Sequence, residues 1–468
     1  MSADILDRIA AIIGAKNIVT NADDMVPYLK EWRDLFRGKA RAVIRPGSTA
    51  EVAELVKLAA ETGTPLVPQG GNTGLVGGQI PIAEGRELIL SLQRLDKIRM
   101  VDVEGDTLIV EAGVTLQRAQ EAAEAAGRLF PLSLASEGTC TIGGNLATNA
   151  GGTAVIAYGN ARELCLGLEV VLPDGRIWNG LRQLRKDNTG YDLKNLFIGA
   201  EGTLGIITAA VLKLFPLPAA RATAFLALPG PEEALALLNA AKASAGGTLT
   251  TFELMPRVGL EFVLRHAPGT RDPLSEPSPW YVLMEVSAQS ASGLDEALEA
   301  FLGDALEKEL ITDAALAGSL EQRNAFWKLR EMLSEVQRFE GGSIKHDISV
   351  PVHATPEFLA RAIAKVEEMI PGCRPVPFGH LGDGNIHFNV SQPIGADKEA
   401  FIARWDEVNH EVHAIVADMH GSISAEHGIG RLKRYLLPGV KDPVELDLMR
   451  TLKATLDPKG IFNPGAVL

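Results

Sequence analysis

Apolar and polar positions in the first hundred residues follow two different periods. The apolar runs at 40–46 and 64–68 are typical of strands, whereas apolar residues between them, over 52–59, recur at helical spacing. Ser48 followed three residues later by Glu51 is the signature of a capping box, so we expect the intervening helix to begin there. A strand–helix–strand unit of this kind predicts a small parallel sheet.

The same pattern continues along the chain. Strand-like runs occur at 88–92 and 107–113, and a helical pattern covers about 115–126. The stretch 166–178 reads as a hairpin with Asp174-Gly175 as its turn.

Glycine and proline divide the chain into three parts. The proline-rich stretch 216–222 marks a boundary, and the residues beyond it alternate strands with amphipathic helices but lack the earlier glycine density. Glycine and proline return after about residue 420. We therefore predict an α+β protein with a first domain at 1–218, a second at 219–420 and a C-terminal segment at 421–468.

Composition and charge narrow the function classes. The 468 residues carry 45 basic and 59 acidic side chains, a formal charge of -14, which argues against nucleic acid or an anionic membrane as the main partner. A small anionic substrate is still compatible with a locally basic pocket. No stretch is apolar enough for a transmembrane helix, and the first residues do not resemble a secretory signal. Three separated cysteines without a CxxC pair predict no disulfide framework and favour a reducing, cytoplasmic setting.

Two glycine-rich loops, at 68–81 and 135–153, are the first candidate binding elements. Glycine lets successive backbone N–H groups approach an anion, and two such loops together would suit a pyrophosphate between two bulky groups. The alternative is that they are only tight turns. The sequence contains neither a G-x-G-x-x-G motif after a strand nor a P-loop motif, so a Rossmann or P-loop nucleotide site is not expected.

The stretch "PFGHLGDGNIHFNV" (377–390) places His380 and His387 on either side of a tight turn centred on Asp383-Gly384. If His380 ends the incoming strand, both imidazoles converge at the mouth of the hairpin. Two imidazoles and a carboxylate from elsewhere, such as Glu426, would form an open divalent-metal site. The alternative is a hydrogen-bonded histidine pair that stabilises the turn.

A competing histidine cluster lies in "WDEVNHEVHAIVADMH". His410, His413 and His420 are spaced by three and seven residues, which places them roughly on one helical face. No carboxylate near them completes a known metal pattern, so a half-buried helix face is the simpler interpretation.

Six motifs in order give the chain a family resemblance, which covers about residue 40 to the C-terminus. They resemble the FAD-linked D-2-hydroxyacid dehydrogenases, flavoproteins of the vanillyl-alcohol-oxidase/PCMH type, and fit the branch acting on D-2-hydroxyglutarate best, ahead of those acting on D-lactate or glycolate. The motifs lie at 68–81, 142–152, 185–208, 379–390, 424–430 and 456–465.

The resemblance implies a bipartite PCMH-type FAD-binding domain of two α+β subdomains, an α+β substrate domain, and a C-terminal segment that returns to the FAD domain. Neither glycine-rich loop contains a histidine, so we expect FAD to bind without a covalent link. The positions that match cofactor contacts are Pro68, Gly70, Gly71, Asn72, Thr73, Gly74, Gly138, Thr139, Gly143, Gly144, Thr148, Asn149, Gly151, Gly152, Glu201, Gly202, Ile207 and Asn463.

The resemblance also assigns the chemistry. It implies that His380, His387 and Glu426 bind a divalent metal, with zinc favoured by the ligand type. A metal on the substrate hydroxyl lowers the pKa of that hydroxyl, and we expect His427 to take the proton as general base. The alternative for His427 is a structural role in a glycine-rich bend.

Four further positions match contacts to the substrate. Arg330, Lys345 and Asn389 correspond to groups that hold its carboxylate, and a forked guanidinium suits that task. Ser334 stands where the D-2-hydroxyglutarate branch usually has Thr, and His346 where it tends to have Tyr. The second departure leaves the preference for a distal carboxylate open.

The leading hypothesis is therefore an FAD- and metal-dependent dehydrogenase that converts a D-2-hydroxy acid to the 2-oxo acid and passes electrons to a protein or quinone. A metal hydrolase with merely structural glycine loops is one alternative. A non-catalytic FAD-binding subunit of a multi-subunit oxidase is the other. The oligomeric state stays open, with a homodimer among the options.

Overall fold

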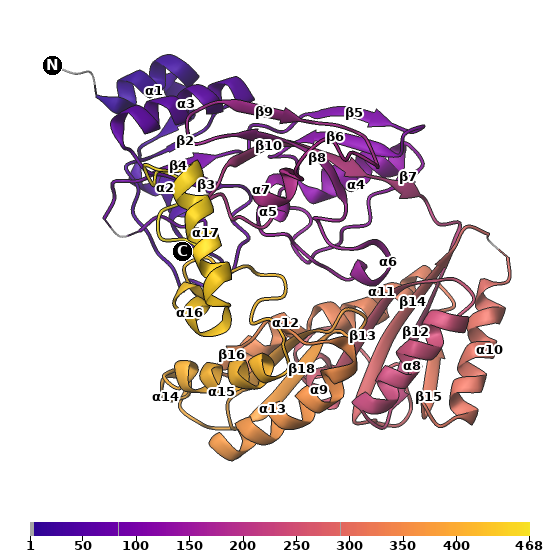
Figure 1. Cartoon of the computed structure of the whole chain (residues 1–468). Helices are drawn as coiled ribbons and strands as arrows, with labels where there is room; N and C mark the ends of the chain where they lie inside the picture. Colours follow the sequence, from indigo (N-terminus) through magenta and orange to yellow (C-terminus); the bar gives the residue numbers. More distant parts are fainter. Residues whose placement is uncertain (1–3, 83, 291) are drawn as a thin grey trace. The chain divides into compact units, whose positions relative to one another are not determined.

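The computed structural model describes residues 4–82, 84–290 and 292–468, and these form two compact units (Figure 1). Unit 1 consists of residues 1–151, 160–217 and 426–468, and unit 2 consists of residues 152–159 and 218–425. The chain passes from one unit to the other near the predicted boundaries. The short excursion at 152–159 was not predicted.

Unit 1 begins with a four-stranded sheet in the order β1-β2-β4-β3. Its strands β2, β4 and β3 are parallel, as expected, but β4 lies between β2 and β3, so the predicted strand–helix–strand unit skips one position. The connecting helix α3 (Thr49–Thr62) begins where predicted, because the Ser48 side chain accepts the Glu51 N–H. The strands are β1 (Ile18–Val19), β2 (Ala42–Ile44), β3 (Leu66–Gln69) and β4 (Leu88–Ser91).

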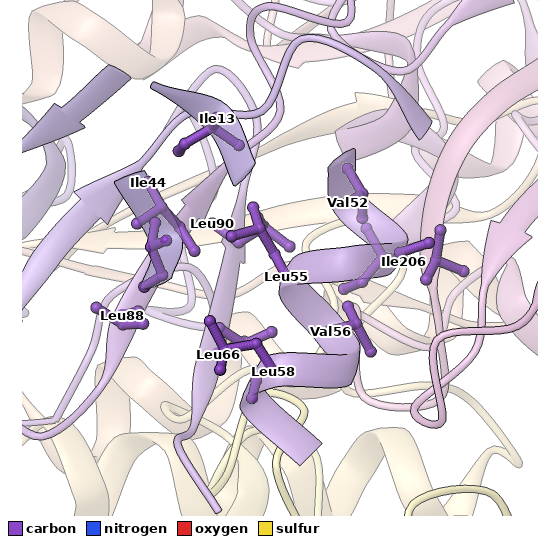
Figure 2. Close-up of a cluster of buried hydrophobic side chains, with 14 of the residues drawn as sticks. Ile13, Ile44, Val52, Leu55, Val56, Leu58, Leu66, Leu88, Leu90 and Ile206 are labelled. Atoms are coloured by element: carbon purple, nitrogen blue, oxygen red, sulfur yellow. The ribbon is translucent and has the colours of Figure 1, made fainter. Parts of the chain in front are cut away.

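Helix α3 packs its apolar face on this sheet and forms the core of the unit (Figure 2). Val52, Leu55 and Val56 on the helix are buried against Ile44 and Leu90 on the strands. Each fully buried side chain of this size contributes about 1.5–3 kcal/mol. The core therefore fixes β3, and with it the start of the first glycine-rich loop.

A five-stranded antiparallel sheet follows, in the order β5-β6-β10-β8-β9. Its strands β8 and β9 form the predicted hairpin, and Gly175 in the turn has φ +79°. The strands are β5 (Ile98–Asp102), β6 (Thr107–Glu111), β8 (Cys165–Val171), β9 (Ile177–Gly180) and β10 (Ile206–Lys213).

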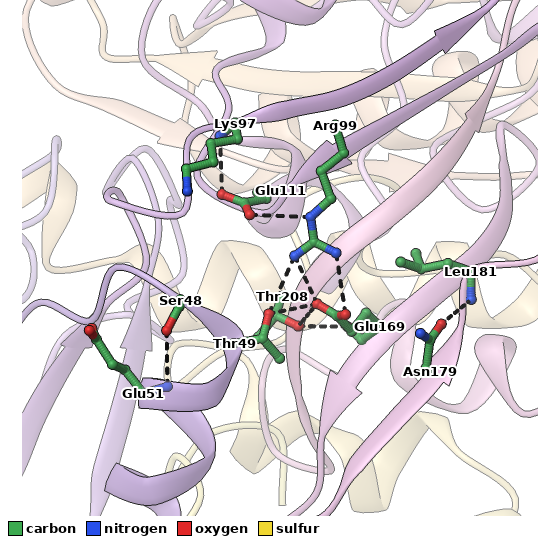
Figure 3. A network of polar contacts seen from close by, with 10 residues as sticks. All are labelled: Ser48, Thr49, Glu51, Lys97, Arg99, Glu111, Glu169, Asn179, Leu181 and Thr208. Atoms are coloured by element: carbon green, nitrogen blue, oxygen red, sulfur yellow. Dashed lines mark hydrogen bonds and ion pairs between the residues drawn. The ribbon is translucent and has the colours of Figure 1, made fainter. Parts of the chain in front are cut away.

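Arg99 on β5 connects this strand to β6 and β8 through a polar network (Figure 3). Its guanidinium lies 3.2 Å from Glu111 and 3.1 Å from Glu169. Glu169 also accepts hydrogen bonds from the hydroxyls of Thr49 and Thr208. Burial raises the pKa of Glu169, but Arg99 and the two hydroxyls outweigh it and lower the pKa, so the carboxylate stays charged.

The C-terminal segment returns to unit 1 along β3. The Leu66 N–H donates to the Ile461 carbonyl at 2.8 Å, and the Asn463 N–H donates to the Leu66 carbonyl at 2.8 Å. Helix α17 (Pro443–Leu456) precedes this strand-like pairing, and its Lys453 Nζ donates to the carbonyls of Thr203 and Phe462. Asn463 is thereby fixed beside the first glycine-rich loop.

Unit 2 is built on an antiparallel sheet in the order β15-β12-β14-β13-β18-β19-β16, with β17 also paired to β19. Helices α13 (Thr355–Met369) and α15 (Trp405–Asp418) pack on each other beside this sheet (Figure 1). The strands are β12 (Ala220–Leu228), β13 (Thr248–Pro256), β14 (Trp280–Ala288), β15 (Asp313–Leu316), β16 (Ser343–Lys345), β17 (Ile348–Ser349), β18 (Arg374–His380) and β19 (Asn385–Ser391).

Within the described ranges, every helix is too short or too polar to cross a membrane. All three cysteines are free and buried.

Candidate active site

A pocket in unit 1 lies where the two glycine-rich loops, the start of β10 and the C-terminal segment come together. Its empty volume is about 950 Å³, counting the space at its mouth. The predicted cofactor positions that line it are Pro68, Gly70, Gly71, Asn72, Thr73, Gly74, Gly143, Gly144, Thr148, Glu201, Gly202, Ile207 and Asn463. His427, the predicted base, lines the same pocket.

Other predicted cofactor positions do not line this pocket. Gly138, Thr139, Asn149 and Gly151 lie in the second glycine-rich loop but outside the lining, and Gly152 begins the excursion assigned to unit 2. Sequence reasoning also missed lining residues, among them Gln79, Thr141 and Asn145. These polar residues flank the glycines, which is the signal that would have identified them.

The two loops contact each other through backbone that only glycine permits. A Cβ on Gly71 would lie 1.9 Å from the Thr139 carbonyl oxygen, and a Cβ on Gly70 would lie 2.3 Å from the Thr141 hydroxyl oxygen. These glycines therefore let the loops pack closely enough to form one pocket wall.

Three buried amide oxygens at this wall have no hydrogen-bond partner among the described residues. They are Oε1 of Gln69, Oδ1 of Asn72 and Oδ1 of Asn463. Their NH₂ groups are occupied: that of Asn463, for example, donates to the Glu201 carbonyl at 2.9 Å. Because an unpaired buried polar atom costs about 1–3 kcal/mol, such acceptors suit a polar ligand with N–H or O–H donors.

In unit 2 the predicted histidine hairpin is present. Strands β18 and β19 pair so that His380 faces Asn385 and His387 faces Phe378. The turn between them has Gly384 at φ +80°, and the Asp383 carboxylate accepts the Asn385 N–H at 3.0 Å. Both imidazoles lie on one face of the sheet, with ring centroids 5.7 Å apart.

Glu253, which sequence reasoning missed, orients His380. It lies on β13 opposite His380, is fully buried, and its Oε1 lies 2.6 Å from His380 Nδ1. A carboxylate at this distance favours the tautomer whose Nδ1–H donates and whose lone pair is on Nε2. Burial raises the pKa of Glu253, but Arg330 and His380 outweigh it and lower the pKa to about 2.

The predicted substrate residue Arg330 shares the same carboxylate. Its Nε lies 2.6 Å from Oε2 of Glu253, and its guanidinium is 4.9 Å from the centre of the Phe378 ring. Only 9% of its side chain is exposed. One buried carboxylate thus connects the expected metal-binding and substrate-binding groups of unit 2.

Asp347 is a second acidic residue that the sequence analysis did not select. It is 2% exposed, accepts the Asn385 NH₂ at 3.0 Å, and places a carboxylate oxygen 3.8 Å from Nδ1 of His387. Its carbonyl accepts the N–H of Ala425 at 3.3 Å. Glu426, the predicted third metal ligand, is the next residue in the chain.

The remaining predicted substrate residues are neighbours in unit 2. Lys345 on β16 pairs with Asn389 on β19, and Lys345 Nζ donates to the Ser334 carbonyl at 3.0 Å. Asn389 is buried, whereas Ser334 is exposed. Sequence positions 330, 334, 345 and 389 are therefore brought to one region of unit 2.

The competing histidine cluster does not share one helical face. On α15, His413 is buried with its ring 5.6 Å from that of His346, whereas His410 is exposed. His420 lies beyond the end of the helix and is also exposed. The expectation that their spacing gathers these histidines was wrong, because the apolar residues of α15 determine which face is buried.

Comparisons with known proteins agree with this geometry. Residues 40–180 match the family described as "FAD binding domain", and residues 217–467 match "FAD linked oxidases, C-terminal domain". The chain is 38% identical to D-2-hydroxyglutarate dehydrogenase, mitochondrial, of Bos taurus, covering all of this chain and 84% of that protein. It is 37% identical to D-2-hydroxyglutarate dehydrogenase of Xanthomonas citri pv. viticola, covering 97% and 94%.

Among solved structures, p-cresol methylhydroxylase with substrate bound has a TM-score of 0.78 at 17% identity, covering 99% of this chain and 96% of that one. This likeness confirms the predicted α+β PCMH-type fold. The fold and pocket thus define an FAD-dependent oxidoreductase. The chain belongs to the FAD-linked oxidase family of the vanillyl-alcohol-oxidase/PCMH type and is a homologue of the FAD-linked D-2-hydroxyacid dehydrogenases.

The residues present fit FAD. Glycine-rich backbone of both loops lines the pocket, which suits a diphosphate, and the unpaired amide oxygens offer acceptors for the donors of the cofactor. His427 lines the same pocket, so a reacting group bound beside the cofactor would be within the reach of an imidazole.

Proposed function

We propose that this protein oxidises a D-2-hydroxy acid to the corresponding 2-oxo acid, with D-2-hydroxyglutarate as the first candidate substrate. The observation that carries the proposal is the identity of 37–38% with D-2-hydroxyglutarate dehydrogenases over nearly the whole chain. The pocket in unit 1 and the oriented histidine pair in unit 2 support it, because this oxidation needs both a hydride acceptor and a group that acidifies the hydroxyl.

When bound, FAD supplies the acceptor for the hydride from Cα, and a divalent metal supplies a Lewis acid for the hydroxyl oxygen. We assign the metal to His380, His387 and Glu426, with zinc favoured by the ligand type. Two observations support this set. Glu253 favours the His380 tautomer whose lone pair is on Nε2, and Ala425 is hydrogen-bonded to the residue whose carboxylate lies beside His387.

His427 is the proposed general base. An imidazole nitrogen of His427 accepts the hydroxyl proton, the oxygen lone pair forms the C=O bond, and the Cα–H electron pair leaves as hydride. The products are the 2-oxo acid, one proton on His427 and one hydride, that is two electrons and a proton, for which bound FAD would be the acceptor. Neutral imidazole is abundant near pH 7, which suits this role.

Arg330, Lys345 and Asn389 are the proposed carboxylate-binding groups. The Nε of Arg330 is engaged with Glu253, so a substrate carboxylate would be bound through its Nη nitrogens. Lys345 Nζ donates to the carbonyl and hydroxyl oxygens of Ser334, which places an ammonium group beside a hydroxyl group. We further propose that electrons pass to a protein or quinone acceptor and that the enzyme works in the cytoplasm.

Anaerobic titration of the FAD- and metal-loaded protein tests the proposal. D-2-hydroxyglutarate, D-lactate and D-malate are added separately, with the L-enantiomers as matched controls, and flavin absorbance is followed. We expect bleaching by at least one D-acid, by no L-acid, and its suppression by a chelator. A flavin that stays oxidised with every D-acid would overturn the assignment and point to a non-catalytic FAD subunit.

A further inference from the structure

Both carboxylate oxygens of Glu201 are used by the segment that carries His427. Oε1 accepts the Ile429 N–H at 2.7 Å, and Oε2 accepts the Gly430 N–H at 2.8 Å. Residues 426–433 form neither helix nor strand, so these N–H groups have no place in a regular backbone ladder. A carboxylate, as a charged acceptor, forms stronger hydrogen bonds with such N–H groups than a neutral acceptor does.

The neighbouring glycines leave room for this carboxylate. A Cβ on Gly428 would lie 2.7 Å from Oε1 of Glu201, and a Cβ on Gly78 would lie 3.1 Å from Oε2. Gly428 also has φ +80°, a conformation that other residues rarely adopt. The glycine that follows His427 therefore serves the contact with Glu201 as well as the bend.

Glu201 is itself held rigidly. It has φ +50°, which is uncommon for a residue with a side chain, and such backbone persists only where surrounding contacts fix it. Its N–H donates to the Ala147 carbonyl at 2.8 Å, and its carbonyl accepts the side-chain NH₂ of Asn463 at 2.9 Å. Ala147 and Asn463 both line the cofactor pocket. Glu201 therefore links the segment that carries His427 to the wall of this pocket.

The far side of the segment is fixed by backbone alone. The N–H groups of Arg431 and Leu432 donate to the Val76 carbonyl at 2.9 and 3.1 Å, and the Val467 N–H donates to the Gly430 carbonyl at 2.9 Å. These bonds secure residues 430–432 without the Glu201 side chain. The Glu201 carboxylate instead accepts the N–H groups of Ile429 and Gly430, which lie nearer to His427 in the chain.

We propose that Glu201 is a positioning residue whose carboxylate fixes the backbone of residues 429 and 430 and so sets the place of His427 in the cofactor pocket. The inference rests on the proposed function only for the role of His427. It differs from the expectation that position 201 contacts the cofactor, since a carboxylate committed to two loop N–H groups has less to offer a ligand that carries a diphosphate of the same charge.

The test compares Glu201→Gln, Glu201→Ala and Glu201→Asp with Glu31→Gln in the FAD-loaded protein. Glu31 is a matched control in unit 1, because its buried carboxylate also accepts two loop N–H groups, those of Arg33 at 2.6 Å and Leu35 at 2.5 Å. That loop carries no residue of the cofactor pocket. The readouts are FAD stoichiometry, FAD dissociation constant, hydrogen exchange of residues 426–432, kcat, KM and the pH profile of kcat/KM.

We expect Glu201→Ala to keep FAD within about threefold of the wild-type affinity, to raise exchange in 426–432 at least tenfold, and to lower kcat at least tenfold with a smaller change in KM. The basic limb of the pH profile should shift, and Glu201→Asp should restore part of kcat. Glu31→Gln should leave all of these unchanged.

A loss of FAD binding with unchanged exchange in 426–432 would overturn the inference and make Glu201 a cofactor ligand. Equal behaviour of Glu201→Ala and Glu31→Gln would overturn it as well. If instead no D-2-hydroxy acid reduces the wild-type flavin, the proposed function fails, while the exchange measurement still decides whether Glu201 holds the loop.

Discussion

Glu253 and His380 share a hydrogen bond of 2.6 Å between Oε1 and Nδ1 inside the sheet of unit 2. The other oxygen of Glu253 lies 2.6 Å from Nε of Arg330. Outer carboxylates of this kind fix the tautomer and direction of a metal-binding imidazole. Glu253 therefore fixes the orientation of His380, which suits the proposed role of His380 as a metal ligand, and holds Arg330 in place at the same time.

Glu253→Gln is expected to lower the affinity for Zn²⁺ about 10–100-fold. The reason is that a neutral amide neither selects the His380 tautomer with Nδ1–H nor compensates the charge of Arg330. It should also reduce the free energy of unfolding by about 3 kcal/mol, since Arg330 is left buried without its partner. Isothermal titration with Zn²⁺ and thermal unfolding measure the two effects.

Glu285→Gln is the matched control for this variant. Glu285 is buried on the neighbouring strand β14 and pairs with Arg323 at 2.7 Å, so its loss should also cost stability. It should leave Zn²⁺ affinity unchanged. Equal Zn²⁺ affinities in the two variants would show that Glu253 is a structural ion-pair partner only.

The sequence predicted the histidine hairpin but not its support. The Asp383-Gly384 turn and the alternation after it are local signals, and they were sufficient to place His380 and His387 on one face. Glu253 lies 127 positions before His380, and β13 meets β18 through only the pairs Glu253–His380 and Leu254–Gly379. No local pattern reveals so short a pairing.

Two other differences between prediction and structure also arise because local patterns do not encode tertiary packing. The order β2-β4-β3 depends on which strand enters between two others, which periodicity does not encode. On α15 the spacing of histidines was read without the apolar residues, yet Val412 and Val416 decide that His413 faces inward and His410 outward. Local sequence patterns were sufficient to predict the helices and strands, whereas tertiary packing determines which strands pair and which side chains are buried.

Lys345→Met is expected to raise KM for D-2-hydroxyglutarate at least tenfold, about 1.4 kcal/mol of binding, with a smaller change in kcat. The reason is the loss of a cation beside the Ser334 hydroxyl. Ser334→Ala should raise KM only a few-fold, as a neutral hydrogen bond contributes about 1 kcal/mol. Steady-state kinetics with an artificial acceptor provides the measurement.

Lys328→Met is the control for the lysine variant. Lys328 Nζ is exposed and donates to the Pro268 carbonyl at 2.7 Å, so its removal changes the net charge equally without touching the proposed site. If it raises KM as much as Lys345→Met does, long-range charge rather than a carboxylate contact explains the effect.

Arg99→Met is expected to lower the free energy of unfolding of unit 1 by about 1–3 kcal/mol. The substitution leaves the carboxylates of Glu111 and Glu169, 8% and 10% exposed, without their shared cation. The estimate is at the low end for a broken ion pair because the Arg99 side chain is 29% exposed and partly screened. Thermal unfolding is the measurement, and FAD affinity should not change.

Lys57→Met provides the comparison, since Lys57 pairs with Glu54 at 2.7 Å on the exposed face of α3. A surface pair of this kind contributes well under about 1 kcal/mol. Similar losses in both variants would mean that the network of Figure 3 adds nothing beyond an ordinary surface contact.

Glu201 should also give stability an uncommon pH dependence. Burial raises its pKa from 4.5 to about 7, although the N–H groups of Ile429 and Gly430 and the charge of Lys433 oppose the rise. Between pH 4.5 and 7 the folded protein holds a proton that the unfolded chain has released. The free energy of unfolding therefore falls as the pH rises through this window and levels off above about pH 7.

Glu201→Gln cannot titrate, so the wild type should lose about 2–3 kcal/mol relative to this variant between pH 5 and pH 8, measured by denaturant unfolding at equal FAD loading. Glu285→Gln is the control with the opposite window. Burial raises the pKa of Glu285, but Arg323, Trp327 and Arg221 outweigh it and lower the pKa below 4.5, so its contribution is lost only as the pH falls below 4.5. The gap between wild type and Glu285→Gln should stay constant from pH 5 to pH 8. A constant gap for Glu201→Gln as well would mean that the Glu201 carboxylate is already charged at pH 5, and that its two loop N–H groups outweigh the cost of burial.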